Sequence, residues 1–276
     1  MHAGAFLFEQ KEVHARIIIC ILIRVTRSIR WKAGSSVTRP GLHHEVAGRV
    51  GSLIAQGSLR PGEVLPNEMA LGAKLGVSRT AIREGVKVLA SKGLVEVRRK
   101  TGTRVRPAAE WNMLDPEVLG WLFSGSGIPP ALADLMDVRR VVEPAAARMA
   151  AERGTEDDLF RIRLAWVEME QATGDLPSAV ESDLRFHLAV LEATHNVFMR
   201  PFGALIQAAL RASFRLTNSN AAHYRKSLVR HREVLEAVEA GNGEAAEEAM
   251  TAVLTQTARD LDAQTRAARR EATGKR

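Results

Sequence analysis

Residues 57–68 read GSLRPGEVLPNE, residues 75–84 read LGVSRTAIRE and residues 93–105 read GLVEVRRKTGTRV. These three stretches determine the fold of the N-terminal part of the chain, because residues typical of turns alternate in them with residues typical of helix ends. Asn67 and Ser78 are residue types that cap helix N-termini, and Gly93 is typical of a helix end. The stretches predict two short helices, at about 67–75 and 79–92, which are followed by a change of periodicity.

A helix precedes these stretches and a hairpin ends them. Apolar residues recur at helical spacing across residues 42–54. Residues 94–105 are typical of two short strands around a turn that contains Gly102. Three short helices and a basic hairpin form a winged helix-turn-helix, which we place at residues 39–106.

In such a unit the third helix enters the major groove of DNA and the hairpin lies along the backbone or the minor groove. The polar residues that share the exposed face of the predicted third helix are Arg79, Thr80, Arg83 and Lys87. Arginine can read guanine through two hydrogen bonds, while threonine and lysine more often hold phosphates. The alternative is a solvated helix face without a partner, but the basic hairpin beside it favours contact with DNA.

The charge of the chain supports this prediction. The 276 residues carry a net charge of +7. Residues 41–108 hold 12 basic and 5 acidic residues, whereas residues 109–265 hold 15 basic and 24 acidic residues. A basic N-terminal part on an acidic body indicates that one part meets a polyanion, and nucleic acid is the leading candidate.

The remaining composition excludes several classes of protein. A single cysteine, Cys20, excludes a disulfide framework and a multi-cysteine zinc site. The apolar run at residues 17–23 is far shorter than the roughly 20 residues that span a bilayer. We therefore expect a cytoplasmic protein with no membrane partner. Residues 1–38 are expected to be an extension without function, either disordered or the result of a start assigned too early.

The second part of the chain is predicted to be helical throughout. After a linker at residues 107–114, Asp115 and Pro116 form a typical helix start. The predicted helices span about 115–124, 130–152, 155–173, 177–194, 198–217, 221–240 and 243–265. The fold class is thus mainly α, with a winged helix-turn-helix before an all-helical bundle of six to seven helices at 115–265. A basic tail follows at 266–276.

Three residues of the bundle could form a metal site. Asp183 and His187 are four residues apart on one predicted helix, so both can face one ion. Taken alone, such a pair is more often a hydrogen-bonded surface couple. His231 lies within an apolar helical face, where a buried histidine with satisfied hydrogen bonds is the ordinary alternative.

The stretches quoted first closely resemble the DNA-binding domain of the GntR family. The resemblance implies that Arg79, Thr80 and Arg83 contact DNA and that Gly102 lies at the tip of the wing, close to the minor groove.

Two positions depart from the family pattern. Met69 stands where an arginine often contacts DNA, so we expect that contact to be absent. Gly85 stands where alanine is usual, which costs the helix up to about 1 kcal/mol.

The second part resembles the helical ligand-binding domain of the FadR-type subfamily, called the FCD domain. The motifs that carry this resemblance are Leu135-Met136-x-Val138-Arg139-x-x-Val142-Glu143-Pro144-x-Ala146-Ala147, Asp183-x-x-Phe186-His187 and His231-Arg232-x-Val234-Leu235-x-Ala237. The whole resemblance covers about residues 42–264. Within the subfamily, the chain is most similar to regulators of sugar-acid catabolism, of the galactonate-operon repressor type.

The resemblance implies a divalent metal ion, Zn²⁺, Ni²⁺ or Mn²⁺, held by Asp183, His187 and His231. The fourth ligand of the family falls at Val253, which cannot bind a metal. Three ligands with open positions can still hold an ion, with solvent or an effector carboxylate completing the shell.

Arg139 matches a family arginine that faces the ligand cavity, where it would bind a small carboxylate. Its alternative is an internal salt bridge with Glu143, four residues away. Thr217 and Asn218 are expected by analogy to bind effector hydroxyls, although polar residues at a helix end more often act as caps.

Together these features predict a transcriptional repressor, not an enzyme. It binds operator DNA as a homodimer, and a small carboxylate or sugar acid controls that binding. One alternative is a metal-dependent lyase or hydrolase that uses Asp183, His187 and His231, but no nucleophile motif or paired-carboxylate signature accompanies them. The other is an architectural DNA binder without an effector.

Overall fold

A computed structural model describes residues 41–98, 100–125, 131–172, 175–217 and 221–274. The N-terminal extension predicted at residues 1–38 lies outside the described residues.

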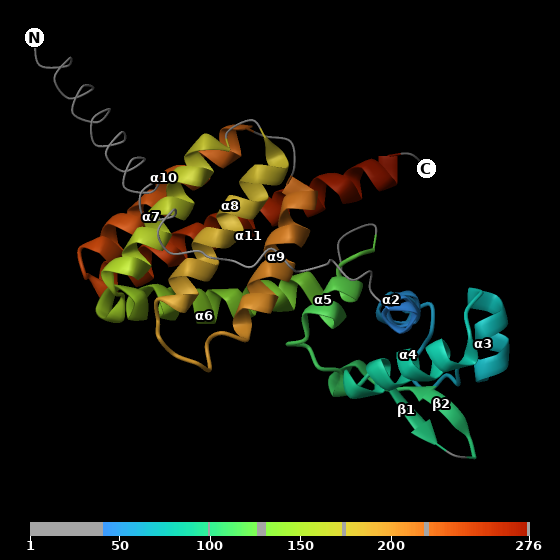
Figure 1. Ribbon diagram of the computed structural model, residues 1–276. Coiled ribbons are helices and arrows are strands. Elements are labelled where there is room, and N and C mark those ends of the chain that lie inside the picture. The colour runs from blue at the N-terminus through green and yellow to red at the C-terminus, as the bar shows by residue number, and fades with distance from the viewer. Residues whose placement is uncertain (1–40, 99, 126–130, 173–174, 218–220, 275–276) are drawn as a thin grey trace, which may run out of the picture. The chain divides into compact units, whose positions relative to one another are not determined.

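The first part of the structure is a winged helix-turn-helix, as predicted (Figure 1). Its elements are α2 (Leu42–Ala55), α3 (Glu68–Leu75), α4 (Arg79–Ser91), β1 (Val95–Arg98) and β2 (Gly102–Val105). The two strands pair in antiparallel register, with Val95 opposite Val105 and Arg98 opposite Gly102. Val64 adds an isolated bridge to Arg104, so the loop before α3 is tied to the hairpin.

Local sequence signals set the helix ends. The Asn67 side chain accepts a hydrogen bond from the backbone of Ala70, and Ser78 caps α4 in the same way through Ala81. Each cap satisfies one of the backbone N–H groups that a helix N-terminus leaves without a partner. Gly76 ends α3 in the left-handed conformation, as the predicted turn requires.

Two glycines allow close packing inside this part. A Cβ atom on Gly85 would lie 2.6 Å from Cγ1 of Val46, so α4 approaches α2 more closely than alanine allows. From the sequence alone, Gly85 was expected only to weaken α4. The structure shows that the missing side chain also lets α4 pack closely against α2. A Cβ atom on Gly51 would lie 2.4 Å from the ring of Trp121, which lies on the first α-helix after the hairpin.

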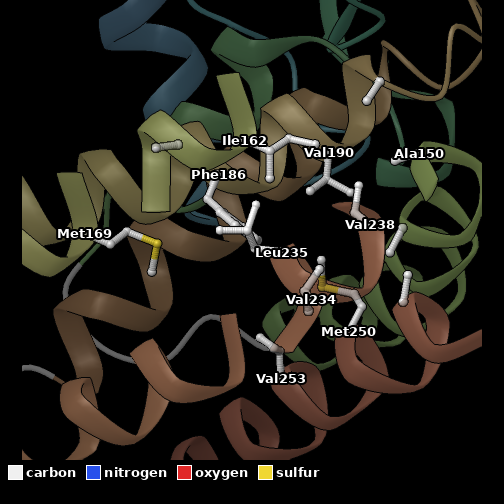
Figure 2. Packing of buried hydrophobic residues seen from close by; sticks show 14 of the residues in the cluster. Ala150, Ile162, Met169, Phe186, Val190, Val234, Leu235, Val238, Met250 and Val253 are labelled. Atoms are coloured by element: carbon white, nitrogen blue, oxygen red, sulfur yellow. The ribbon is translucent and has the colours of Figure 1, made fainter. Parts of the chain in front are cut away.

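The second part is helical, with no strand among its described residues. Its elements are α5 (Pro116–Leu122), α6 (Ala131–Arg153), α7 (Glu156–Gln171), α8 (Leu176–Glu192), α9 (Phe202–Thr217), α10 (Ala221–Glu239) and α11 (Gly243–Gly274). Helix α11 packs against α6 and α10, and α8 packs against α7 and α9. Figure 2 shows the core between them, where Phe186, Ile162 and Val234 are fully buried.

Two helix boundaries differ from the prediction by more than two residues. Helix α9 begins at Phe202 rather than near residue 198, because Pro201 disfavours helical backbone at the residue before it. Helix α11 continues to Gly274 instead of ending near residue 265. The alanine- and arginine-rich sequence after 265 contains no helix breaker before that glycine.

The segment predicted as a linker, residues 107–114, is held against the winged helix. It contains a 3₁₀ turn at Ala108–Glu110, and the Asn112 N–H donates to the carbonyl of Lys92 at 2.9 Å. The Lys92 ammonium lies 2.6 Å from Asp115 and 2.8 Å from Glu117, with its side chain only 12% exposed. The end of α4 and the start of α5 are therefore joined by ion pairs.

His195, in the loop after α8, has an acidic partner on another helix. Its Nε2 atom lies 2.7 Å from the Asp158 carboxylate, although the side chain is half exposed. Burial opposes ionisation of Asp158, but hydrogen bonds from Thr155 and His195 lower the pKa of this carboxyl. The contact joins the loop after α8 to the first turn of α7.

We predict that Gly51→Ala destabilises the winged helix by about 1–3 kcal/mol, because the added methyl group displaces Trp121 from a packed core. Gly48→Ala is the matched control on the same helix. Its Cβ would lie 3.8 Å from Trp121, an ordinary contact, so alanine should raise stability by up to about 1 kcal/mol. Urea unfolding followed by tryptophan fluorescence measures both effects, and equal midpoints for the two variants would contradict the packing argument.

Candidate functional site

The exposed face of α4 carries the predicted DNA-contacting residues. The described side chains at this face are Arg79, Thr80, Arg83 and Lys87, all exposed. On the opposite face Ile82 and Leu89 are fully buried. The helix therefore presents one polar face to solvent and packs the other into the core.

Two of these cations have acidic neighbours at the surface. Arg83 Nε lies 3.7 Å from the Glu68 carboxylate on α3, and Lys87 Nζ lies 2.8 Å from Glu84. The side chains of both cations are about two-thirds exposed. Exposed ion pairs contribute little to stability, so both cations can exchange these partners for phosphates or bases. The Arg83–Glu68 contact cannot be predicted from short-range spacing, because it joins two helices.

The wing adds further positive charge beside α4. Gly102 begins β2 at φ +82°, a backbone conformation that glycine adopts readily. Arg98 and Lys100 are exposed on the hairpin, while Arg104 donates to the carbonyl of Gly62. Gly102 is the one residue of this hairpin that the sequence predicts to lie at the DNA. Arg98 and Lys100 are additional candidates for phosphate contact, and the run of basic residues was their signal.

Met69 lies exposed near the start of α3. Its side chain has no charge or hydrogen-bond donor. The arginine contact of the related domains therefore has no counterpart at this position.

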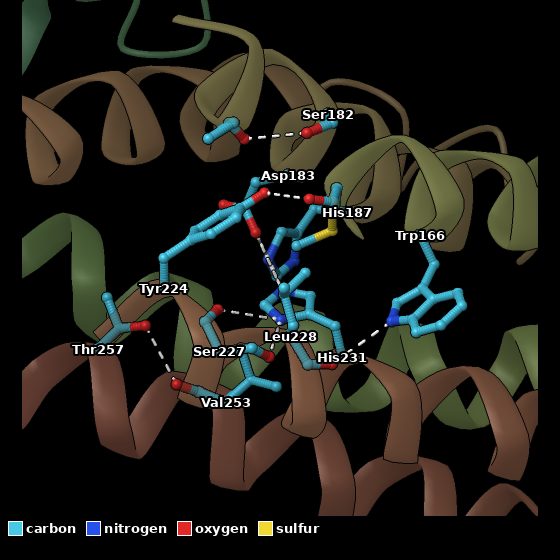
Figure 3. A network of polar contacts seen from close by, with 12 residues as sticks. Trp166, Ser182, Asp183, His187, Tyr224, Ser227, Leu228, His231, Val253 and Thr257 are labelled. Carbon is cyan, nitrogen blue, oxygen red and sulfur yellow. Dashed lines mark hydrogen bonds and ion pairs between the residues drawn. The ribbon is translucent and has the colours of Figure 1, made fainter. Parts of the chain in front are cut away.

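A cluster of three buried side chains lies in the helical part. Asp183 and His187 come from α8, and His231 comes from α10 (Figure 3). Each of the three residues is at most 4% exposed. His231 Nε2 lies 3.0 Å from Asp183 Oδ1 and 3.3 Å from His187 Nε2, and His187 Nε2 lies 3.9 Å from Asp183 Oδ1. The three residues singled out in the sequence thus point potential ligand atoms at one place.

The size of this triangle suits a metal ion. Tetrahedral zinc binds nitrogen and oxygen at about 2.0–2.2 Å, which separates neighbouring ligand atoms by about 3.3–3.6 Å. The observed separations, 3.0 to 3.9 Å, bracket that range. Two imidazoles and a carboxylate are also a donor set that zinc, nickel and manganese accept. The residues therefore fit a divalent cation.

A second set of contacts surrounds the cluster. His231 Nδ1 lies 2.8 Å from the carbonyl of Ser227, and His187 Nδ1 lies 2.5 Å from Glu143 Oε2. Arg139 Nε donates to the other oxygen of Glu143, also at 2.5 Å. The chain from Arg139 through Glu143 to His187 joins α6 to α8.

These contacts determine which groups are charged. Burial opposes ionisation of Glu143, yet the Arg139 guanidinium and the His187 ring lower the pKa of this carboxyl to about 2. Burial likewise opposes ionisation of Asp183, but contact with His231 lowers its pKa. Burial disfavours protonated His231, and Asp183 nevertheless raises the pKa of this ring. The cluster therefore combines two carboxylates with cations that balance them.

Arg139 forms the internal salt bridge that the sequence left open as an alternative. Its Nε and Nη2 atoms face Glu143, while Nη1 lies 3.8 Å from the Met136 sulfur. Because sulfur is a weak acceptor, the Nη1 side of this buried guanidinium is poorly satisfied by the described residues. Glu143 also contacts His187, and the sequence does not predict this contact because it joins two helices.

The other predicted positions contribute less to the site. Val253 is 5% exposed and belongs to the apolar core, so it supplies no fourth ligand. Asn218 lies outside the described residues, and the side chain of Thr217 is not described either.

Comparisons with known proteins identify a family model for each of two stretches of the chain. Residues 42–105 match the family model of bacterial regulatory proteins of the gntR family, and residues 134–256 match the FCD domain. The galactonate operon transcriptional repressor of Escherichia coli (strain K12) is 35% identical over 213 residues, covering 77% of this chain and 93% of that protein. The transcriptional regulator LutR of Bacillus subtilis (strain 168) is 32% identical over 208 residues, covering 74% and 93%.

Solved structures share the fold. The structure titled as Lar, from Listeria monocytogenes, has a TM-score of 0.59 at 20% identity and covers 81% of this chain and 98% of that one. Within the described part of the chain, no helix is both long and apolar enough to cross a membrane.

The matching families and relatives are regulators rather than enzymes, which decides against the lyase or hydrolase alternative. The chain belongs to the GntR family of bacterial transcriptional regulators and carries an FCD domain behind its DNA-binding unit.

Proposed function

We propose that this regulator is a repressor that binds operator DNA as a homodimer in the cytoplasm and responds to a small carboxylate or sugar acid. The buried cluster of Asp183, His187 and His231, with the Arg139 guanidinium connected to it through Glu143, carries the proposal. Such a concentration of buried polar groups is costly for folding alone. A ligand-binding role explains why the helical domain retains it.

On the DNA side, α4 provides the sequence readout. Arg83 and Arg79 read base edges in the major groove, while Thr80 and Lys87 hold phosphates. Gly102 lets the wing approach the duplex closely, because it carries no side chain. A dimer places two such helices on half-sites about one helical turn apart.

In the helical domain, Asp183, His187 and His231 would hold Zn²⁺, Ni²⁺ or Mn²⁺. The ion would supply a Lewis-acidic centre that binds an effector oxygen. With Val253 in place of a fourth ligand, an open position is left for the effector or solvent. We therefore expect a weaker metal affinity than that of a four-ligand site.

The effector carboxylate would bind the Nη1 side of Arg139, where the observed contact is with sulfur. Arginine can engage a carboxylate through two parallel hydrogen bonds. Thr217 and Asn218 are proposed to bind hydroxyl groups of the effector. The likeness to the galactonate operon repressor supports a hydroxylated acid as the class of ligand.

Helix α5 is the proposed route from effector to DNA. Val118 and Trp121 belong to the core of the winged helix, whereas Leu119 and Phe123 belong to a cluster with residues of α6 and α9. The ion pairs of Lys92 fix the start of α5 to the end of α4. A shift of the helical domain would therefore move the winged helix with it, and the effector must favour one arrangement over another to change operator affinity.

We predict that Arg83→Ala weakens binding to an operator selected from random duplex DNA by about 1–3 kcal/mol. The fold should persist, because this side chain is exposed. Arg211→Ala is the control, since Arg211 is another exposed arginine that pairs with a glutamate of a neighbouring helix. Unchanged operator affinity in the Arg83 variant, measured by fluorescence anisotropy at fixed salt, would remove this residue from the readout.

We further predict that Asp183→Ala abolishes most metal binding but leaves operator affinity without effector nearly intact. The measurement is the zinc content per chain after equilibration with ZnCl₂ and desalting. Glu181→Ala on the same helix is the control, because this side chain is about half exposed and pairs with Arg211. Loss of operator binding by a folded Asp183 variant would show that the two domains do not divide the work in this way.

A further inference from the structure

The two histidines of the cluster can bind a metal only through a nitrogen that carries no proton. Neutral imidazole has one N–H donor and one nitrogen with a lone pair, and the contact of one nitrogen determines the state of the other. The outer contacts of His187 and His231 therefore decide whether their inner Nε2 atoms can act as ligands.

The outer contact of His231 is with a backbone carbonyl. Its Nδ1 lies 2.8 Å from the oxygen of Ser227, which can only accept a hydrogen bond. When neutral His231 carries its proton on Nδ1, where the Ser227 carbonyl accepts it, the Nε2 lone pair faces the cluster. This is the state that a metal ion at the cluster requires, because a bound cation replaces the proton that Asp183 would otherwise accept from Nε2.

His187 depends on a side chain from a different helix. Its Nδ1 lies 2.5 Å from Glu143 Oε2, as an ion pair rather than an aligned hydrogen bond. A carboxylate oxygen at this distance repels a lone pair on Nδ1 and therefore favours a proton on that nitrogen. Glu143 in turn is held by Arg139, and all three residues are at most 2% exposed. Bulk water is thus largely excluded from this chain of contacts.

We propose that Glu143 is a positioning residue for the metal site: it holds His187 in the tautomer whose Nε2 faces Asp183 and His231, and Arg139 holds Glu143. This inference rests on the proposed metal binding. Outer-sphere carboxylates that accept from a ligating histidine fix its tautomer and orientation. Arg139 then has two roles. Its Nε holds Glu143 and so supports the metal ligand His187, and its Nη1 faces the proposed position of the effector carboxylate.

The test compares Glu143→Gln with wild type in two measurements. Zinc affinity, measured by competition with a chromophoric chelator, should fall about 10- to 100-fold. Nitrogen-15 NMR of the metal-free protein should show His187 protonated on Nδ1 in wild type and lose that state in the variant. Glu152→Gln is the matched control, because Arg148 and Glu152 form an exposed pair with the same spacing on the same helix, and it should change neither result.

A second variant guards against failure to fold. Glu143→Gln leaves the buried Arg139 without its counter-charge, which is strongly destabilising. The double variant Arg139→Met, Glu143→Leu removes both charges and keeps apolar volume, so it should remain folded. We expect the same loss of zinc affinity and the same loss of the Nδ1–H state of His187.

The outcomes separate this inference from the proposed function. If the variants bind zinc as wild type does and the His187 tautomer is unchanged, Glu143 does not position the ligand and the inference is overturned. If wild type itself binds no zinc, the metal part of the proposed function fails. The NMR comparison then decides alone whether Glu143 sets the tautomer of His187.

Discussion

The buried ion pair between Arg139 and Glu143 is the constraint on which the helical domain depends. Removing two charges from water costs several kcal/mol per ion, and the pair is tolerated only if each group keeps its partners. Glu143 meets this condition with Arg139 on one side and His187 on the other. Since these residues come from α6 and α8, a change in the register of either helix would leave a buried charge unpaired. The same contacts orient the side chains that face the proposed metal.

The DNA-binding unit is connected to this domain by a helix that packs in two cores. Trp121 of α5 fits against Gly51, while Leu119 and Phe123 pack with residues of α6 and α9. Lys92 adds a largely buried ion pair at the junction. Coupling between two sites requires an element whose position both sites influence. Helix α5 meets this requirement by its packing, which is why we propose it as the route of the signal.

Features determined by neighbours in the chain could be predicted from the sequence. The caps at Asn67, Ser78 and Asp115 and the buried face of α4 depend on short-range spacing. Contacts between distant helices could not be predicted in this way. Glu143 was recognised as a partner of Arg139 four residues away, but not as a partner of His187, because that contact depends on how α6 packs on α8. For Gly85 the sequence predicted only a weaker helix. It could not predict the close packing against Val46, because Val46 lies on a different helix, α2.

The proposed function requires that occupancy of the helical domain controls affinity for DNA. The most direct measurement is fluorescence anisotropy of a selected operator, titrated with the regulator in the presence of individual sugar acids and small hydroxy acids, galactonate first, with and without Zn²⁺. The account predicts that one of these acids changes operator affinity at least about fivefold, the lower end of typical coupling between sites, and that the effect requires the metal. Specific binding that no acid alters, with or without the metal, would contradict it and favour a DNA binder without an effector.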